Sequence, residues 1–588
     1  MQRFRSFRGL WFPACLIIFF VQGLAGSWAQ ADAPVLYFSD IAGGPKTGNS
    51  DTSLGQSAGQ NGAIVTIWGR HLDSARVYCN GAEAAHYYFR GNATAPADLY
   101  TFHRMQMISF QVSALAQDGA GAVYATTSGG RSNDLPFTVR AGNIYFVQTT
   151  GDDATGSGTW SLPWRTILKA VATIAPGDIA YIGDGVDATS EADNRAAVNL
   201  DSDGTSTQPK ALVVYPGAVS RVGNPTIERA FFLQSNYHGG FSMYWVIAKF
   251  RLTTAQIGAP AYTGFRVVGN YITAPYGDGL DGAINGSGDH VRVLGNELDR
   301  AGATTCTKFY HAIYFTGYRT DDPPRAPMES DREIAWNYVH DCLTNRAINI
   351  YSEQANSAYI ERHSVHDNVI LNQKGDGILL GDFVIGENWV YNNLLIRAGG
   401  GPEWDEPSYH TGIHLGTGHD NIPASTTIIH IYNNTLYGCG WSGAVYTEEN
   451  GSLVILPWAV ARSTLRLWNN IIYSTGDPYI ATESVALPGA DYRNCWFGAG
   501  VGPAWDTGAI NLDPQFRAAA GNDLQLALGS PCIDAGRDVS AIVARDLLGA
   551  PRPQGAAFDV GAYEFTVAPT AAARWSLYGH RRQRGERE

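Results

Sequence analysis

The chain has 588 residues, carries a formal net charge of −13 and contains 67 glycines. The acidic balance argues against nucleic acid as a partner, because a nucleic-acid site needs a basic surface. Abundant glycine is typical of a turn-rich β protein and disfavours a helical one.

Residues 1–31 have the pattern of a secretory signal. Three arginines precede an apolar run over residues 10–24, and small residues around Ala29 offer a cleavage site. The alternative is an uncleaved anchor, which Pro13 and the shortness of the run disfavour. No later segment is long and apolar enough to cross a membrane. We therefore expect a secreted protein (extracellular, periplasmic or on the cell surface) with no membrane span after signal removal.

Residues 33–140 have the pattern of a separate β module. Short apolar segments alternate with glycine-rich turns, and strands at that spacing predict a small sandwich. The module resembles the IPT/TIG immunoglobulin-like domains through the sequences at residues 65–69 and 137–139. That resemblance implies a spacer or binding role, and we expect no chemistry here.

Residues 144–183 form a distinct junction. A short strand and a Gly-Asp loop precede a segment with helical spacing, and a lone amphipathic helix at this place would cover the open edge of the first coil of a solenoid. The residues expected on its buried face are Trp164, Ile167, Leu168, Val171 and Ile174. The junction resembles the entry segment of secreted right-handed parallel β-helix proteins of the pectate-lyase-like superfamily.

One phrase recurs after this junction, an apolar strand followed by Asn-x-(Ile/Leu/Val). Its asparagines are Asn270, Asn296, Asn337, Asn368, Asn393, Asn434 and Asn470. A unit repeated with variable insertions predicts a solenoid of stacked coils, and stacked asparagines can satisfy one another's amides at a buried corner. We predict an all-β fold, with a right-handed parallel β-helix over residues 144–510 after the immunoglobulin-like sandwich.

Residues 511–564 resemble the choice-of-anchor segment found at the C-terminus of many secreted bacterial β-helix proteins. The basic tail over residues 565–588 has no apolar run and is expected to be disordered, which leaves surface anchoring open. An even number of cysteines after the signal is compatible with disulfides in an exported protein. We expect the pairs Cys306–Cys342 and Cys495–Cys532, with Cys79 and Cys439 as buried thiols.

A second phrase, small-apolar-x-apolar, follows most of the repeated asparagines. Strand side chains alternate, so one polar and aromatic column is predicted on the outside of the tube. It contains Asn285, Tyr314, Asn349, Leu379, His414 and Tyr446. The adjacent column is uniformly small: Ala283, Ala312, Ala347, Gly377, Gly412 and Ala444. These small residues indicate either a shallow groove for an extended polymer or a tightly packed corner.

Charged residues precede the same strands. His311, Arg346 and Asp376 fall at one phase of consecutive coils, and neighbouring strands lie about 4.8 Å apart, so these side chains should stack. An arginine beside Asp376 would keep that carboxylate ionised. Three more polar residues lie close by in the sequence or in a neighbouring coil: Lys374, His410 and His414.

These residue types suit β-elimination from a uronate. Arg346 would neutralise the substrate carboxylate, and His311 or Lys374 would remove the C5 proton. Tyr314 or His414 would protonate the leaving oxygen. Each of them also has an ordinary alternative as a structural salt bridge or a satisfied histidine. Substrate contacts are expected from Asn349, Trp404, His410 and Tyr446.

Glycoside hydrolysis is the second mechanism, and it needs two carboxyl groups at a set separation. The candidates are Asp376, Asp382, Glu353, Glu403 and Asp405. The chain lacks the arginine-proline signature of pectate lyases and the paired-aspartate pattern of polygalacturonases. The resemblance therefore implies a polysaccharide-active enzyme, and a lyase is favoured over a hydrolase.

A non-catalytic surface or adhesion protein that binds polysaccharide is the alternative from another class. The IPT/TIG-like module and the anchor-like C-terminus favour it. No cofactor is required by the sequence, although aspartates in the turns could bind Ca²⁺, and the metal requirement is left open. We expect a monomer with polysaccharide as its partner.

Overall fold

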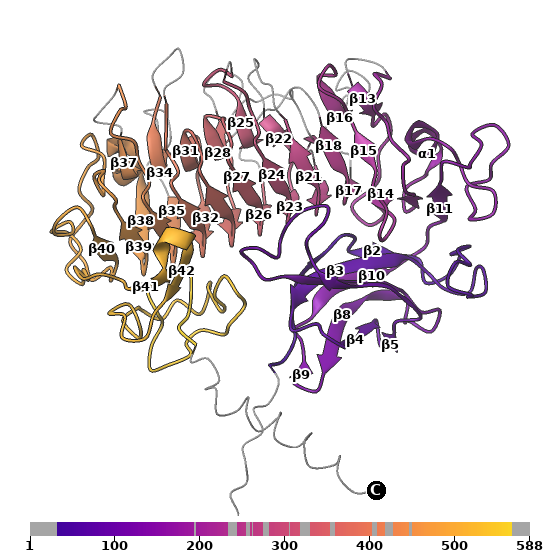
Figure 1. The fold of residues 1–588 in the computed structure, drawn as a ribbon, viewed down its shortest axis with the longest axis horizontal. Helices are drawn as coiled ribbons and strands as arrows, with labels where there is room; N and C mark the ends of the chain where they lie inside the picture. Colours follow the sequence, from indigo (N-terminus) through magenta and orange to yellow (C-terminus); the bar gives the residue numbers. More distant parts are fainter. Residues whose placement is uncertain are drawn as a thin grey trace, which may run out of the picture. The chain divides into compact units, whose positions relative to one another are not determined.

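The computed structural model describes most of the chain (Figure 1). The described residues are 32–192, 196–232, 244–253, 259–260, 263–274, 282–304, 306–317, 330–352, 359–402, 408–417, 427–445 and 450–566. Residues 32–566 form one compact unit, and its helices are short: α1 (Ile167–Thr173), α2 (Pro457–Arg462) and the 3₁₀ turn η3 (Ala519–Gly521). Within the described ranges, no helix has the length and apolar character that a membrane crossing requires. The predicted signal and most of the predicted tail lie outside these ranges.

The N-terminal part is a β-sandwich of two sheets that share one apolar core. The antiparallel first sheet has the order β1-β3-β7-β6, with β1 (Val35–Ser39), β3 (Ile64–Arg70), β6 (Tyr87–Asn92) and β7 (Gln106–Gln111). The second has the order β2-β10-β8-β4-β5, with β9 beside β8. Its strands are β2 (Gly43–Gly44), β4 (Arg76–Cys79), β5 (Ala82–Glu83), β8 (Gly119–Thr127), β9 (Gly130–Arg131) and β10 (Leu135–Val139). Trp68, Val77 and Phe137 are buried in the core.

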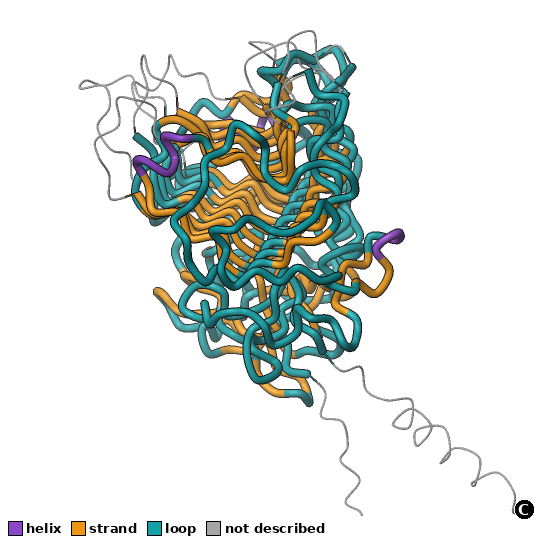
Figure 2. The backbone as a smooth tube through the Cα atoms, turned by 90° about the vertical axis from the view of Figure 1, so that its left-hand side faces the viewer, coloured by secondary structure: helices purple, strands orange, loops and turns teal. Residues whose placement is uncertain are grey.

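The rest of the unit is a parallel β-helix whose strands lie over one another in successive coils (Figure 2). The first parallel sheet contains β11 (Ile144–Val147), β12 (Ile179–Ile182), β14 (Lys210–Val214), β17 (Trp245–Ala248), β20 (Arg266–Val268), β23 (Arg292–Leu294), β26 (Arg332–Ala335), β29 (His363–His366), β32 (Glu387–Tyr391), β35 (Thr427–Tyr432) and β38 (Ser463–Trp468). The second parallel sheet contains β15 (Arg221–Val222), β18 (Arg251–Thr253), β21 (Tyr271–Thr273), β24 (Glu297–Asp299), β27 (Tyr338–His340), β30 (Val369–Leu371), β33 (Leu394–Ile396), β36 (Thr435–Tyr437), β39 (Ile471–Tyr473) and β40 (Cys495–Phe497).

The third parallel sheet carries the predicted polar columns. It contains β19 (Ala259–Pro260), β22 (Gly282–Gly286), β25 (His311–Phe315), β28 (Arg346–Ser352), β31 (Asp376–Asp382), β34 (His410–Thr417) and β37 (Asn450–Ile455). A parallel pair, β13 (Ala196–Asn199) and β16 (Arg229–Phe232), lies in the early coils. The predicted fold class is therefore confirmed: an all-β chain in which a right-handed parallel β-helix follows a small immunoglobulin-like sandwich.

The repeated asparagines form the predicted buried ladder. Asn337 Oδ1 accepts hydrogen bonds at 3.0 Å from both the backbone N and the Nδ2 of Asn296. Its own Nδ2 donates to Asn368 Oδ1 at 3.0 Å and to the backbone oxygen of Val293 at 2.9 Å. The pattern recurs at every predicted position and extends one coil further, to Asn494. Each asparagine side chain therefore accepts hydrogen bonds from the preceding coil through its oxygen, and its own nitrogen donates to neighbouring coils, so these buried polar groups are all hydrogen-bonded.

Helix α1 lies where the sequence predicts a cap on the first coil. Thr166 Oγ1 accepts a hydrogen bond from the backbone N of Lys169 at the helix start. Ile167 and Val171 are buried in the β-helix core. The prediction for Leu168 is wrong, because its side chain is 43% exposed. Successive helical residues are rotated by about 100°, which turns Leu168 away from the face that Ile167 occupies.

The sandwich packs on the outward side of the first parallel sheet. The buried Tyr181 hydroxyl donates to the Ile64 carbonyl at 2.8 Å and accepts from the Ile64 backbone N at 2.6 Å. Lys249 Nζ lies 3.1 Å from Asp40 Oδ2 and donates to Thr66 Oγ1 at 2.8 Å. Both sets of polar contacts are buried, where hydrogen bonds and ion pairs are stronger than in water. They therefore fix the position of the sandwich on the β-helix.

The C-terminal segment packs against the last coils. It contains the small hairpin β41 (Phe516–Ala518) and β42 (Asp523–Leu526). The fully buried side chains of Arg552 and Glu564 form an ion pair with Nη1 and Oε1 2.7 Å apart. Arg552 Nη2 also donates to Asn392 Oδ1 of the β-helix at 3.2 Å.

The predicted disulfides are absent from the part of the chain that the structure describes. Both cysteines of each predicted pair are buried thiols, as are Cys79 and Cys439. The Cys342 thiol donates to the backbone oxygen of Leu298, and burial raises its pKa to about 12. Adjacent coils bring cysteines near each other, but a disulfide also needs its Cβ atoms about 3.8 Å apart and facing each other.

Candidate active site on the third parallel sheet

Four strands of the third parallel sheet position the candidate site. In-register pairing places Tyr314 beside Asn349, Asn349 beside Leu379, and Leu379 beside His414. Arg346 is the register partner of Asp376 at the start of the neighbouring strand. The predicted columns are therefore present over these coils.

Asp376 is the centre of the cluster and is fully buried. Its Oδ2 lies 3.3 Å from Arg346 Nε and 3.2 Å from His414 Nδ1. Its Oδ1 accepts from the Thr411 backbone N at 3.0 Å and from Thr411 Oγ1 at 2.8 Å. Burial alone would raise the pKa of this carboxyl. The hydrogen bond from His414, with the charge of Arg346 and the bond from Thr411, more than offsets burial and holds the pKa below its usual value.

The ionised Asp376 fixes the tautomer of one histidine. A carboxylate only accepts hydrogen bonds, so His414 donates from Nδ1, and Nε2 bears the lone pair whenever the ring is neutral. The His414 ring lies 4.2 Å from the Tyr409 ring, between centroids. Tyr409 and Thr411 were missed as site residues. The strand phase places Thr411 next to Asp376, so that contact could have been found from the sequence.

His311 is held as a neutral imidazole in the adjoining coil. Burial, together with the positive charge of Arg346, lowers its pKa well below the usual value, against the opposing charge of Asp376. Its Nδ1 is buried and has no hydrogen-bond partner in the described structure. The Tyr314 ring lies 5.1 Å away, between centroids.

Two further polar groups face the same region with hydrogen-bonding capacity to spare. Arg346 uses Nε on Asp376, which leaves its two Nη nitrogens without a hydrogen-bond partner among the described residues. Asn349 is buried, and its Oδ1 likewise has no partner there. Unsatisfied buried polar atoms are rare in folded proteins, so Asn349 Oδ1 and His311 Nδ1 mark a place where a polar ligand would be accommodated.

The remaining candidates fall into two groups. Lys374 and His410 are buried next to the cluster, with His410 Nδ1 3.2 Å from the Lys374 carbonyl and the His410 ring 4.9 Å from that of Trp441. The others lie outside the described residues: Tyr446, Trp404, Glu353, Glu403 and Asp405.

The predicted groove of small residues is wrong. Ala283, Ala312 and Ala347 are fully buried in the β-helix core. A Cβ added to Gly377 would lie 2.6 Å from a side-chain carbon of Leu395, on the second parallel sheet. Ala312 and the next residue, Ile313, are both fully buried in the core, so the alternation of side chains fails at the start of this strand. The alternative of a tightly packed corner is the correct one.

The last repeat of the predicted column is also misplaced. His414 pairs with Val454, and Thr411 pairs with Gly451. The strand of that coil is β37, so the residue that continues the column after His414 is Val454, while the predicted Tyr446 lies outside the described residues. An insertion before β37 moves the true register partner further along the chain.

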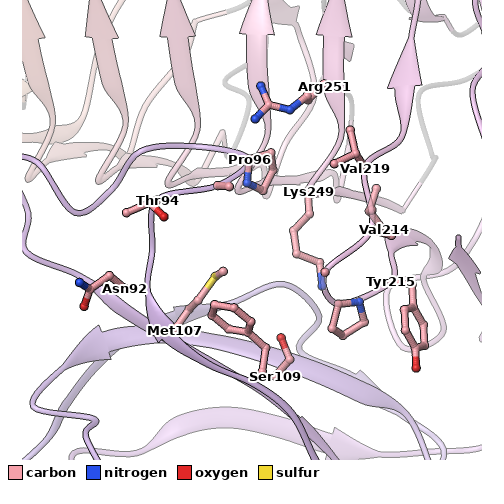
Figure 3. A pocket seen from close by; sticks show the side chains of 15 residues that line it. Asn92, Thr94, Pro96, Met107, Ser109, Val214, Tyr215, Val219, Lys249 and Arg251 are labelled. Atoms are coloured by element: carbon pink, nitrogen blue, oxygen red, sulfur yellow. The ribbon is translucent and has the colours of Figure 1, made fainter. Parts of the chain in front are cut away.

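A cavity of about 190 Å³ lies between the sandwich and the β-helix, away from this cluster (Figure 3). Phe89 and Met107 line it from the sandwich, and Tyr215, Lys249 and Arg251 line it from the β-helix. No carboxylate or histidine lines it. Lys249 is already paired with Asp40 and Thr66 of the sandwich, so its contact belongs to the docking of the two parts.

No protein-family model matches the sequence, and no curated protein matches it. Solved structures with a similar fold include the complex structure of XylC with xylose, at 11% identity and a TM-score of 0.42, covering 72% of this chain and 98% of that one. The crystal structure of pectate lyase Pel9A is similar at 14% identity and a TM-score of 0.35, covering 72% and 96%. The fold assignment here rests on the parallel strand pairing.

Proposed function

We propose that the chain is a secreted polysaccharide lyase that cleaves a uronate-containing polymer by β-elimination at the cluster around Asp376. The observation that carries this proposal is the convergence on one sheet of a neutral His311, the Arg346 Nη nitrogens, which bind no other described residue, and the Asp376–His414 pair. A neutral imidazole can take a proton, and a fixed guanidinium can hold a carboxylate in two parallel hydrogen bonds.

Each step has a residue to perform it. The Nη groups of Arg346 bind the uronate carboxylate and stabilise the charge that develops next to it. His311 removes the C5 proton, with Lys374 as the alternative base. The C5 electron pair forms the C4–C5 double bond as the C4–O bond breaks. Tyr314, or His414 when its ring carries a proton on Nε2 as well, then protonates the leaving oxygen.

Hydrolysis is supported less well by the same residues. Asp376 accepts four hydrogen bonds and has a lowered pKa, which is unsuitable for a general acid. Asp382 lies on the same strand, and at about 3.3 Å per residue the two Cα atoms are about 20 Å apart. Inverting hydrolases hold their carboxyls within about 9.5 Å. The other candidate carboxylates lie outside the described residues.

The test offers purified protein a panel of uronate-containing polymers and follows two signals in parallel. A rise in ultraviolet absorbance from an unsaturated uronide is the expected result. Reducing ends without that absorbance would identify a hydrolase and overturn the proposal. Binding without either signal across the panel would favour the adhesion protein.

A further inference from the structure

A second cluster of titratable side chains lies on the outward face of the second parallel sheet. Asp299 on β24 and His340 on β27 are register partners on adjacent strands. The residues preceding them, Leu298 and Val339, are buried in the core, so Asp299 and His340 point outward. With Asp341, they form the one group of three or more described histidines, cysteines and acids whose donor atoms lie within 4.8 Å of one another.

One atom of each residue faces a common point. His340 Nδ1 lies 3.0 Å from Asp341 Oδ2 and 3.7 Å from Asp299 Oδ1. Asp299 is only 6% exposed, and its Oδ1 has no hydrogen-bond donor in the described structure. A buried carboxylate oxygen without a donor is costly. A bound cation would supply what this oxygen lacks.

The imidazole is oriented from behind. Glu297 Oε1 lies 3.1 Å from His340 Nε2. Because a carboxylate only accepts, Nε2 carries a proton, and Nδ1 is the nitrogen able to bind a cation when the ring is neutral. A carboxylate on the second nitrogen is the usual outer partner of a metal-bound histidine, because it fixes the ring and increases its basicity.

The outer oxygens of the two aspartates are held as well. Asp299 Oδ2 accepts from the Tyr271 hydroxyl and from Arg300 Nη2, both at 2.6 Å. Asp341 Oδ1 accepts from Asn372 Nδ2 at 2.7 Å. Each aspartate is thus anchored through one oxygen and presents the other to the common point. This division between anchored and presented atoms is what a preorganised metal site requires.

We propose that Asp299, His340 and Asp341 bind one divalent transition-metal ion of the zinc type. One imidazole nitrogen and carboxylate oxygens are a donor set that zinc accepts, and three protein ligands leave a fourth position for water. Calcium and magnesium take oxygen ligands, so the central imidazole disfavours them.

The ion would act as a structural clip. It joins the coil of β24 to the coil of β27 through Asp299 and His340. Glu297 extends the connection to the sandwich, because its Oε2 accepts a hydrogen bond from the Asp98 backbone N at 2.6 Å. The site is on a different sheet from Asp376, so its occupancy is separable from the proposed catalysis.

The test measures zinc bound per chain by equilibrium dialysis and metal analysis, for the full chain and three variants. The full chain should hold one zinc. Glu297→Gln should weaken binding at least tenfold, since outer partners typically contribute 10- to 100-fold to metal affinity. Asp341→Asn removes the charge of a proposed ligand and should weaken binding by at least as much. Asp331→Asn is the matched control: His290 Nδ1 lies 2.9 Å from Asp331 Oδ2, but Arg292 occupies the place of a second acid.

Two results would overturn the proposal. The first is no zinc on the full chain, as expected if a protonated His340 simply pairs with its three carboxylates. The second is zinc that remains in Asp341→Asn and Glu297→Gln. Cobalt substitution identifies the ligands independently: absorption from nitrogen and oxygen ligation is expected, and thiolate charge-transfer absorption would assign the ion to the cysteines instead.

Discussion

At the scale of single residues, His311 is subject to two opposite charges. Burial and the Arg346 guanidinium lower its pKa, and Asp376 acts against them. Removing the arginine should therefore raise this pKa, and removing the aspartate should lower it further. We expect an NMR titration of His311 to show a neutral ring at pH 7. The pKa of His311 should rise in Arg346→Gln and fall in Asp376→Asn. A His311 that is protonated at neutral pH would exclude it as the base.

Much of the candidate site followed from strand phase alone. Once coils stack in register, His311, Arg346 and Asp376 must be neighbours, and the structure brings them together. Orientation within the strand could not be predicted, because alternation fails at its start, where the consecutive residues Ala312 and Ile313 are both buried. Partner-free atoms such as Asn349 Oδ1 also depend on the geometry of all their surroundings.

At the scale of elements, the asparagine ladder should be a large source of stability. Asn337→Ala removes the acceptor of two hydrogen bonds from Asn296 and leaves those buried donors unsatisfied. At about 1–3 kcal/mol for each unsatisfied group, we expect a loss of at least about 2 kcal/mol in the free energy of unfolding. Asn92→Ala, at an exposed strand end, is the control and should change it by less than about 0.5 kcal/mol. Equal effects in chemical denaturation would contradict the ladder's role.

The C-terminal segment should depend on one buried ion pair. Arg552→Met leaves the fully buried Glu564 carboxylate without its partner. Breaking such a pair typically costs about 3–5 kcal/mol, so limited proteolysis should release the segment early. Adding Glu564→Gln removes the stranded charge and should restore much of the resistance. Equal rates of proteolysis for wild type, Arg552→Met and the double variant would show that the ion pair does not hold the segment in place.

The elements differ in how far the sequence could place them. The ladder was predictable because every coil repeats the same short phrase around a buried amide. The strand after His414 was not, because an insertion shifts its register partner to Val454. For the cysteines, sequence phase gives the coil but not the state of the sulfur: Cys495 and Cys532 are free thiols although their side chains contact each other.

At the scale of the whole molecule, a buried histidine next to the contact between sandwich and β-helix should make stability depend on pH. The backbone oxygen of Asp367, the residue after this histidine, lies 2.8 Å from His103 Nε2 of the sandwich. Burial lowers the pKa of His366, but hydrogen bonds to Asp367 and Glu333 raise it overall to about 9. A raised folded pKa stabilises the protein below pH 6.5, and this contribution is lost as the pH rises through about 9. Relative to His366→Gln, we expect wild-type stability to fall by about 3 kcal/mol across that window. A pH-independent difference in denaturation would contradict this.

The docking of the sandwich itself could not be predicted from the sequence. Tyr181 and Lys249 each lie within ordinary β-helix strands or turns, and nothing local indicates that Ile64 and Asp40 are their partners. Such contacts form between the surfaces of two folded parts, which no local sequence pattern describes. The coils, in contrast, can be predicted because each one repeats the same short sequence.

The most direct test of the proposed function is the initial rate of unsaturated uronide formation by wild type and by Arg346→Ala, with Arg292→Ala as the control. Arg292 is a half-buried arginine that pairs with Asp331 on the first parallel sheet. We predict turnover by wild type and by Arg292→Ala, and at least a 100-fold loss in a folded Arg346→Ala protein, as is typical when one charge-stabilising group is removed. A folded Arg346→Ala protein with full activity would contradict the assignment of the site.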